Sequence, residues 1–143
     1  MKVLVDTCVI LDALQKREPF WSDSAELFRA AAARKIFACV TAKSSSDIYY
    51  LMHKFNHSDT ETRHLMGNLF SIFPLLDSAG IDCQKALLSR VADYEDAIMI
   101  ETALREGMDC IITRNLRDYS FSPLPVYSPQ EFLKRMNNNE QYR

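Results

Sequence analysis

Short apolar runs alternate with longer amphipathic segments along this chain, and this alternation strongly constrains the fold. We expect strands at residues 2–6, 37–41, 73–76, 110–113 and 126–127. Apolar residues spaced three and four apart predict helices at residues 9–15, 23–32, 44–55, 58–72, 82–91 and 94–106, and from residue 128 onward. Strands that alternate with helices favour an α/β fold, with a mainly parallel central sheet and helices on both faces.

Several helix ends carry capping residues. The predicted N-caps are Asp23 with Glu26, the serines at 44–46, Ser58 with Glu61, and Ser128 with Pro129 and Glu131. Gly107 stands where a C-cap glycine is typical. The polar residues after Met136 predict a frayed tail, so we divide the chain into one domain at residues 1–136 and a tail at residues 137–143.

The length and composition fit one globular domain. The chain has 143 residues, of which 48% are hydrophobic and 25% charged, and this is enough to bury a core. No segment is long and apolar enough to span a membrane. Asp6 and Asp12 interrupt the first apolar run, and no signal-peptide cleavage site follows it. We therefore expect a cytoplasmic protein with no membrane association.

The composition disfavours several kinds of site. With three glycines the chain has no Gly-rich phosphate loop, which excludes P-loop and dinucleotide-binding folds. The cysteines form no CxxC pair, so we expect reduced, buried thiols and no structural zinc at Cys8, Cys39, Cys83 or Cys110. The histidines at positions 53, 57 and 64 favour a solvated polar face over a metal site.

The formal net charge of -2 argues against a protein held on nucleic acid by bulk positive charge. It leaves room for a local basic rim around an acidic pocket. The candidates for such a rim are Lys16, Arg17, Lys43, Lys54, Arg114 and Arg117. Each of them is also explained as an ordinary surface charge.

Four aspartates are the candidate site residues. Asp6 ends the first strand, and Asp118 follows the strand at 110–113. Asp47 and Asp96 are expected in the first turns of their helices. All four positions would face the same end of one sheet, where parallel strands bind ligands. A cluster of carboxylates is what a hard divalent cation requires.

Each aspartate also has a structural explanation. Capping and the helix dipole favour aspartate in a first helical turn, which accounts for Asp47 and Asp96 taken singly. Asp118 fits a turn. Asp6 is harder to explain in this way, because a carboxylate that ends a buried strand is costly unless it is paired or bound to metal. The shared location of all four favours a site.

The segments around these aspartates resemble the PIN-domain family of small ribonucleases, which includes the VapC-type toxins of bacterial toxin–antitoxin pairs. The resemblance runs through residues 3–12, 17–20 (Arg-Glu-Pro-Phe), 46–51, 93–97 and 112–119, and so covers nearly the whole chain. The order and spacing of these segments are more specific than any single one. Two positions depart from the family pattern: Asp47 replaces a frequent Glu, and Cys8 replaces a small polar residue.

The resemblance implies that Asp6, Asp47 and Asp96 hold Mg2+ or Mn2+, with Asp118 assisting directly or through water. A metal-bound water would attack an RNA phosphodiester, and Thr113 and Asn115 would orient metal waters or the scissile phosphate.

Clustered carboxylates repel, so in the absence of metal at least one should have a raised pKa. The expected partners are an RNA substrate, a cognate antitoxin if the protein is a toxin, and a second copy in a homodimer. Tyr49 or Tyr50 would be placed to stack a base, although a core position for at least one of them is the simpler expectation.

Two other functions stay open at this stage. One is a PIN-like module that has lost catalysis and binds RNA or protein, which the departures at Asp47 and Cys8 favour. The other is a phosphotransfer domain or aspartyl-phosphate phosphatase, which also has an aspartate at a strand end. The phosphatase type requires a second aspartate where Cys8 stands. A receiver domain requires a lysine at the end of a late strand, and none follows residues 126–127.

Overall fold

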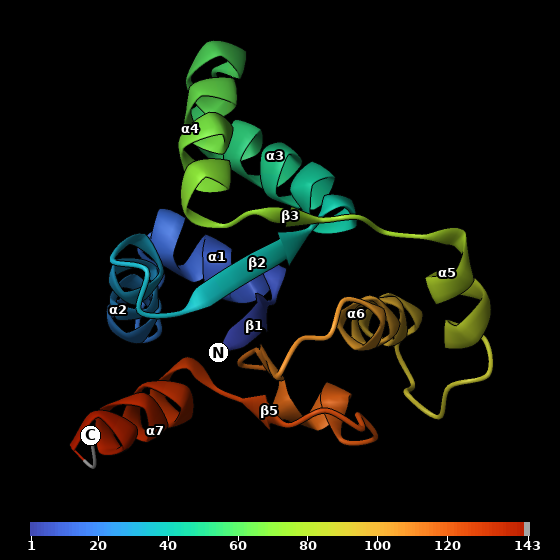
Figure 1. Ribbon diagram of the computed structural model, residues 1–143. Helices are drawn as coiled ribbons and strands as arrows, with labels where there is room; N and C mark the ends of the chain where they lie inside the picture. Colours follow the sequence, from blue (N-terminus) through green and yellow to red (C-terminus); the bar gives the residue numbers. More distant parts are fainter. Residues whose placement is uncertain (142–143) are drawn as a thin grey trace.

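A five-stranded sheet forms the centre of the molecule in this computed structural model, which describes residues 1–141 (Figure 1). The strands are β1 (Lys2–Val5), β2 (Phe37–Thr41), β3 (Leu75–Leu76), β4 (Cys110–Ile112) and β5 (Val126–Tyr127). Their order in the sheet is β3-β2-β1-β4-β5, and every pair of neighbours is parallel. The predicted α/β fold with a mainly parallel sheet is confirmed.

Helices connect the strands and cover both faces of the sheet. They are α1 (Thr7–Leu14), α2 (Trp21–Ala32), α3 (Ala42–Asn56), α4 (Asp59–Ile72), α5 (Gly80–Ala86), α6 (Tyr94–Arg105), the 3-10 helix η1 (Leu116–Tyr119) and α7 (Pro129–Gln141). Within the part of the chain that is described, none of these helices has both the length and the apolar character that crossing a membrane requires.

The C-terminal helix is longer than the sequence predicted. α7 continues to Gln141, so the frayed tail expected from residue 137 is helical as far as this residue. A polar sequence reduces burial, but it does not prevent an established helix from adding further backbone hydrogen bonds. Residues 142 and 143 of the predicted tail lie outside the described residues.

Successive strand residues point to opposite faces, which gives the sheet two cores. Val3 and Val5 of β1 pack in one core with residues from α1, α2, α3, α4 and α7. Leu4, between them, packs in the other core with residues from α5, α6 and η1. Figure 1 shows α5 and α6 on the right, apart from α1 and α2 on the left. The carboxyl edge of the sheet therefore lies between two separate hydrophobic cores, one on each face of the sheet.

Two predicted N-caps are wrong. α2 begins at Trp21, because the backbone N–H groups of Phe20 and Trp21 already donate to the Arg17 carbonyl, and Asp23 falls inside the first turn. α3 begins directly after β2, so its N-cap is Thr41, whose hydroxyl accepts the Ser44 N–H at 3.1 Å. The serines that were predicted to cap α3 lie within it.

Three predicted helix ends are confirmed. The Ser58 hydroxyl accepts the Glu61 N–H at 3.1 Å at the start of α4. Ser128 and Glu131 cap each other at the start of α7, with distances of 3.2 and 2.9 Å. Gly107 has a φ of 67°, in the left-handed region that favours glycine, just after α6. The four cysteines are unpaired, as predicted. Cys39 and Cys110 are buried, whereas Cys8 and Cys83 are only partly buried, so the prediction of four buried thiols is half right.

Candidate active site

Residues from the N-terminal turns of α1, α3 and α6 line one pocket of about 530 Å³ at the carboxyl edge of the sheet. Four of the six predicted site residues line this pocket: Asp6, Asp47, Asp96 and Asn115. Because α3 starts at Ala42, Asp47 lies in its second turn rather than its first. The helix dipole acts mainly within the first turn, so it does not explain the presence of Asp47. The helix dipole is therefore excluded as the reason for an aspartate at this position.

Asp6 lies on the floor of the pocket with 7% of its surface exposed. Its backbone N–H donates to the Ile112 carbonyl at 2.9 Å and so extends the pairing of β1 with β4. Thr113, directly after β4, donates its hydroxyl proton to Asp6 Oδ2 at 2.7 Å. Thr113 is fully buried and does not line the pocket. Its hydroxyl proton is donated to the Asp6 carboxylate rather than into the pocket. The Thr113 hydroxyl fixes the orientation of this carboxylate from behind.

Cys8 takes the place near Asp6 where the family often has a small polar residue. Its Sγ lies 3.5 Å from Asp6 Oδ2 and 3.7 Å from Thr113 Oγ1. Burial, together with the negative charge of Asp6, raises the pKa of the Cys8 thiol to about 11. The sulfur therefore stays protonated near neutral pH and acts as a weak donor to Asp6.

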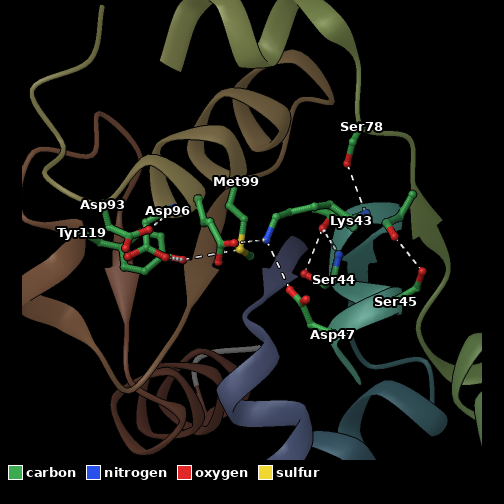
Figure 2. Close-up of polar contacts among 12 residues, drawn as sticks. Lys43, Ser44, Ser45, Asp47, Ser78, Asp93, Asp96, Met99 and Tyr119 are labelled. Atoms are coloured by element: carbon green, nitrogen blue, oxygen red, sulfur yellow. Dashed lines mark hydrogen bonds and ion pairs between the residues drawn. The ribbon is translucent and has the colours of Figure 1, made fainter. Parts of the chain in front are cut away.

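Asp96 is the carboxyl group most affected by its neighbours. Burial raises its pKa to about 6, and the charges of Asp6, Asp93 and Asp118 add to the rise. The Tyr119 hydroxyl opposes the rise by donating to Asp96 Oδ1 at 3.1 Å (Figure 2). The expectation that one carboxylate of the cluster has a raised pKa is confirmed.

Asp93, not Asp96, caps α6. The Asp93 carboxylate accepts the backbone N–H of Asp96 at 3.0 Å (Figure 2). The carboxylate of Asp96 is therefore not needed for capping, and it faces the pocket instead. This separation of roles favours a chemical function for Asp96.

A lysine bridges two acidic side chains across the pocket. Lys43 Nζ lies 3.3 Å from Asp47 Oδ2 (Figure 2). It also lies 3.2 Å from Glu95 Oε1, and so links α3 to α6. Burial would lower the pKa of Lys43, but its hydrogen bonds with Glu95 and Asp47 raise the pKa above the ordinary value. Lys43 is thus a permanent cation among the predicted metal ligands, and Asp47 is held in an ion pair with it.

Asp118 and Asn115 occupy the rim region after β4. Asn115 lines the pocket, and its backbone N–H donates to Thr113 Oγ1 at 3.1 Å. Asp118 lies exposed on η1 and does not line the pocket. Its charge nevertheless reaches Asp96 and contributes to the raised pKa of that group.

Of the six predicted rim cations, Arg17 and Lys43 line the pocket. Arg114 instead binds the buried carboxylate of Asp12, with its Nε 2.7 Å from Oδ2 and an Nη 3.3 Å from Oδ1. The other three predicted rim cations, Lys16, Lys54 and Arg117, are exposed away from the pocket lining.

Sequence reasoning assigned no role to Glu95, Tyr119 and Asp12. Glu95 stands next to Asp96 in a first helical turn, and this position was the one signal for its role. Tyr119 reaches Asp96 from an element 23 residues away, which no local pattern indicates. Asp12 was detectable as a charged residue within the apolar run that forms α1, where it is 1% exposed.

Tyr50 lines the pocket and is 70% exposed, which suits the predicted stacking on a base. Tyr49 instead packs against the core and stacks on His53. The expectation that at least one of the two tyrosines faces the core is confirmed.

The pocket has suitable donors for a divalent cation. Among the described side chains, those of residues 1–139, no three or more of His, Cys, Asp or Glu are already arranged to hold a metal ion. The carboxylates of Asp6, Asp47, Glu95 and Asp96 nevertheless line one pocket and are the hard oxygen donors that Mg2+ and Mn2+ prefer. A cation would also relieve the repulsion that raises the pKa of Asp96. The donor set therefore fits such an ion.

A family model described as the PIN domain matches residues 2–117 of the chain. The chain belongs to the PIN-domain family. The matched range contains Asp6, Asp47 and Asp96, and it ends just before Asp118. No curated protein sequence matches this PIN domain.

Solved structures of toxin–antitoxin proteins share the fold of this PIN domain. VapBC2 from Rickettsia felis, bound to a DNA fragment from its promoter, includes a chain with 15% identity and a TM-score of 0.65, covering 88% of this chain and 97% of that one. A chain of a toxin–antitoxin complex from Klebsiella pneumoniae has 21% identity and a TM-score of 0.66, and the match covers 89% of this chain and 97% of that one. A chain of DNA-bound VapBC from Salmonella typhimurium has 20% identity and a TM-score of 0.65, and the match covers 90% of this chain and 98% of that one. At these identities the similarity establishes the fold.

Proposed function

We propose that this PIN domain is a metal-dependent endoribonuclease that hydrolyses RNA phosphodiester bonds. The observation that carries this proposal is the convergence of Asp6, Asp47 and Asp96 in one pocket at the carboxyl edge of a parallel sheet. The raised pKa of Asp96 supports it, because crowded carboxylates with no need to cap a helix are typical of groups that bind a cation.

In this proposal Asp6 and Asp96 hold Mg2+ (or Mn2+), and Asp47 joins them once it leaves Lys43. The bound metal would supply Lewis acidity and lower the pKa of a coordinated water. Thr113 keeps the Asp6 carboxylate in place, as its 2.7 Å hydrogen bond already does. Asn115, at the pocket edge, would hydrogen-bond to a phosphate or to metal waters. Asp118 lies outside the lining and would act through its charge or through a water.

We further propose that the protein is the toxin of a toxin–antitoxin pair and acts in the cytoplasm. The similar solved structures from Rickettsia felis, Klebsiella pneumoniae and Salmonella typhimurium support a cognate antitoxin as the partner. A homodimer is proposed from the family resemblance alone.

The test is cleavage of a panel of labelled RNAs in Mg2+, Mn2+ or EDTA by the wild type, Asp6→Asn and Asp96→Asn. We expect cutting only with metal, and a loss of at least about 100-fold in both variants, because they remove direct ligands. Asp23→Asn is the matched control, since Asp23 also lies in a first helical turn but does not line the pocket. Cutting that persists in EDTA, or in both site variants, would disprove the proposal.

A catalytically degenerate module that binds RNA or protein is the second candidate. The observation that favours it is the ion pair between Lys43 and Asp47, which occupies the second acidic position. A folded wild type that binds RNA but cuts no RNA with either metal would establish this candidate in place of the nuclease.

A further inference from the structure

Arg17 lines the acidic pocket but has no part in the chemistry proposed above. It lies between α1 and α2, in the Arg17-Glu18-Pro19-Phe20 segment, with 37% of its side chain exposed. Its backbone is fixed on both sides: its N–H donates to the Asp12 carbonyl at 3.0 Å, and its own carbonyl accepts from Phe20 and Trp21. The side chain therefore starts from a rigid position at the pocket.

One edge of the Arg17 guanidinium is anchored. Arg17 Nε donates to Gln15 Oε1 at 2.9 Å. The amide nitrogen of Gln15 lies 3.4 Å from the Leu51 carbonyl and 3.7 Å from Met52 Sδ, both on α3. These contacts fix the plane of the guanidinium through a side chain that itself spans α1 and α3.

The other edge of the guanidinium carries donors without acceptors. The nearest acid is Asp12, whose Oδ1 lies 3.9 Å from Arg17 Nη1, beyond hydrogen-bond distance. The Asp12 carboxylate is already bound by Arg114 through both of its oxygens. Among the side chains that the structure describes, those of residues 1–139, the terminal amino groups of Arg17 thus have no hydrogen-bond acceptor.

Lys43, the second cation of the pocket, is in a different situation. Its ammonium group is paired with Asp47 and with Glu95. Arg17 differs from Lys43 because its terminal amino groups make no hydrogen bond to the described side chains. A guanidinium that is held in one plane, with two amino groups side by side that donate no hydrogen bond, matches the paired oxygens of a phosphate or carboxylate.

We infer that Arg17 binds a phosphate of the RNA backbone next to the acidic pocket and so positions the substrate for cleavage. This inference rests on the proposed nuclease function. Phosphates approaching Asp6 and Asp96 meet like charge, and a fixed cation at the pocket wall offsets that repulsion. Tyr50, exposed and in the same lining, adds an aromatic surface to the pocket. A cation combined with an exposed aromatic ring is typical of sites for single-stranded nucleic acid.

The test measures binding of a labelled single-stranded RNA by fluorescence anisotropy in EDTA, over a series of salt concentrations. We expect Arg17→Ala to weaken binding about tenfold or more, because a charge-assisted contact is lost. The slope of log Kd against log salt should become shallower by about 0.7, the share of one phosphate contact on a single strand. Arg17→Lys should keep most of the slope and lose part of the affinity, because the charge remains and the planar fork does not.

Two further variants test whether the effect of Arg17→Ala comes from a specific contact at the pocket. One disturbs the anchor of Arg17, and the other removes a positive charge elsewhere on the protein. Gln15→Ala releases the anchor of Arg17 Nε and should weaken binding less than Arg17→Ala does. Arg135→Ala removes the same charge from α7, away from the pocket, and should leave the affinity nearly unchanged. In cleavage assays with Mg2+, Arg17→Ala should raise KM more than it lowers kcat.

The outcomes distinguish this inference from the nuclease proposal. If the wild type cuts RNA and Arg17→Ala binds RNA with unchanged affinity and salt slope, the inference is wrong and the nuclease stands. If the wild type binds RNA through Arg17 but cuts nothing, the nuclease proposal fails and the inference stands. An absence of RNA binding by the wild type would also overturn the inference.

Discussion

Asp96 combines a cost to folding with a use in chemistry. Its pKa of about 6 lies above the ordinary value of 3.8, first because the group is partly buried and then because the negative charges of three other aspartates act on it. The folded protein therefore binds this proton more tightly than the unfolded chain does. A cation would bind the ionised carboxylate of Asp96. At neutral pH this ionised form also lowers the stability of the fold.

Because the Asp96 pKa is higher in the folded protein than in the unfolded chain, the stability of Asp96→Asn relative to the wild type should depend on pH. Wild-type stability should fall as the pH rises from about 4 to about 6, the interval between the unfolded and folded pKa values of Asp96. Asparagine carries no charge, so the variant should be more stable than the wild type at pH 7, by about 1 to 2 kcal/mol after allowance for solvent screening. Below about pH 4 the difference should vanish. Urea unfolding at several pH values measures both effects.

Tyr119→Phe is the control for this prediction. It removes the hydroxyl that donates to Asp96 and opposes the rise in pKa. Its stability relative to wild type should therefore fall as the pH rises, the reverse of the trend for Asp96→Asn. An Asp96→Asn variant that is less stable than the wild type at pH 7 would show that the ionised carboxylate has a stabilising partner.

Sequence reasoning worked best for residues whose chemistry is marked by their local position. Asp6 ends an apolar strand and Asp96 begins an amphipathic helix, and both positions can be read without a structure. The partners of these residues could not be predicted. Thr113 turned out to bind Asp6 from behind, and Lys43 to bind Asp47, because these pairings depend on how the strand ends meet in space.

At the scale of elements, α5 is attached to α6 by polar contacts. The Asp82 carboxylate is 1% exposed and accepts from the Ala79 N–H at 3.0 Å and from the Thr102 hydroxyl at 2.9 Å. Arg105 adds two contacts, from Nε at 2.9 Å and from Nη2 at 3.0 Å. Burial alone would raise the pKa of Asp82, but its bonds with Arg105, Ala79 and Thr102 lower it below the ordinary value.

Arg105→Met should therefore destabilise the protein by about 2 to 4 kcal/mol, because it leaves a buried carboxylate without its cation. Thr102→Val removes a single neutral donor and should cost about 1 kcal/mol. Urea unfolding at neutral pH compares the two variants with the wild type. If Arg105→Met stays within about 0.5 kcal/mol of the wild type, α5 is held by its apolar contacts instead.

The C-terminal end of α5 was predicted wrongly. The apolar spacing of Ala86, Leu87 and Val91 predicted a helix to residue 91, but α5 ends at Ala86, and Leu87 is 72% exposed. The residues that fix α5 are Asp82 and Arg105, which are 23 positions apart in the sequence. Hydrophobic periodicity carries no information about such a pair, whereas it located the long helix α6 to within one residue of its observed end.

At the scale of the whole molecule, the pocket joins the two layers of the fold. α3 packs in the core on one face of the sheet and α6 in the core on the other. Lys43 spans the two layers through its ion pairs with Asp47 and Glu95. A divalent cation bound by Asp6, Asp47 and Asp96 would join the same two layers and would compete with Lys43 for Asp47. Cation binding should therefore stabilise the entire domain, since it favours the folded state.

This competition can be measured with Mn2+ by calorimetry and by thermal unfolding. Because Lys43→Met removes a positive charge beside the metal ligands, we expect it to bind Mn2+ about five to tenfold more tightly than the wild type and to gain more in Tm on Mn2+ addition. Lys54→Met removes the same charge outside the pocket lining and should match the wild type. The affinity of every metal-binding variant should fall below about pH 6, where Asp96 takes up a proton. Weaker Mn2+ binding by Lys43→Met would mean instead that Lys43 holds Asp47 in the position that the metal requires.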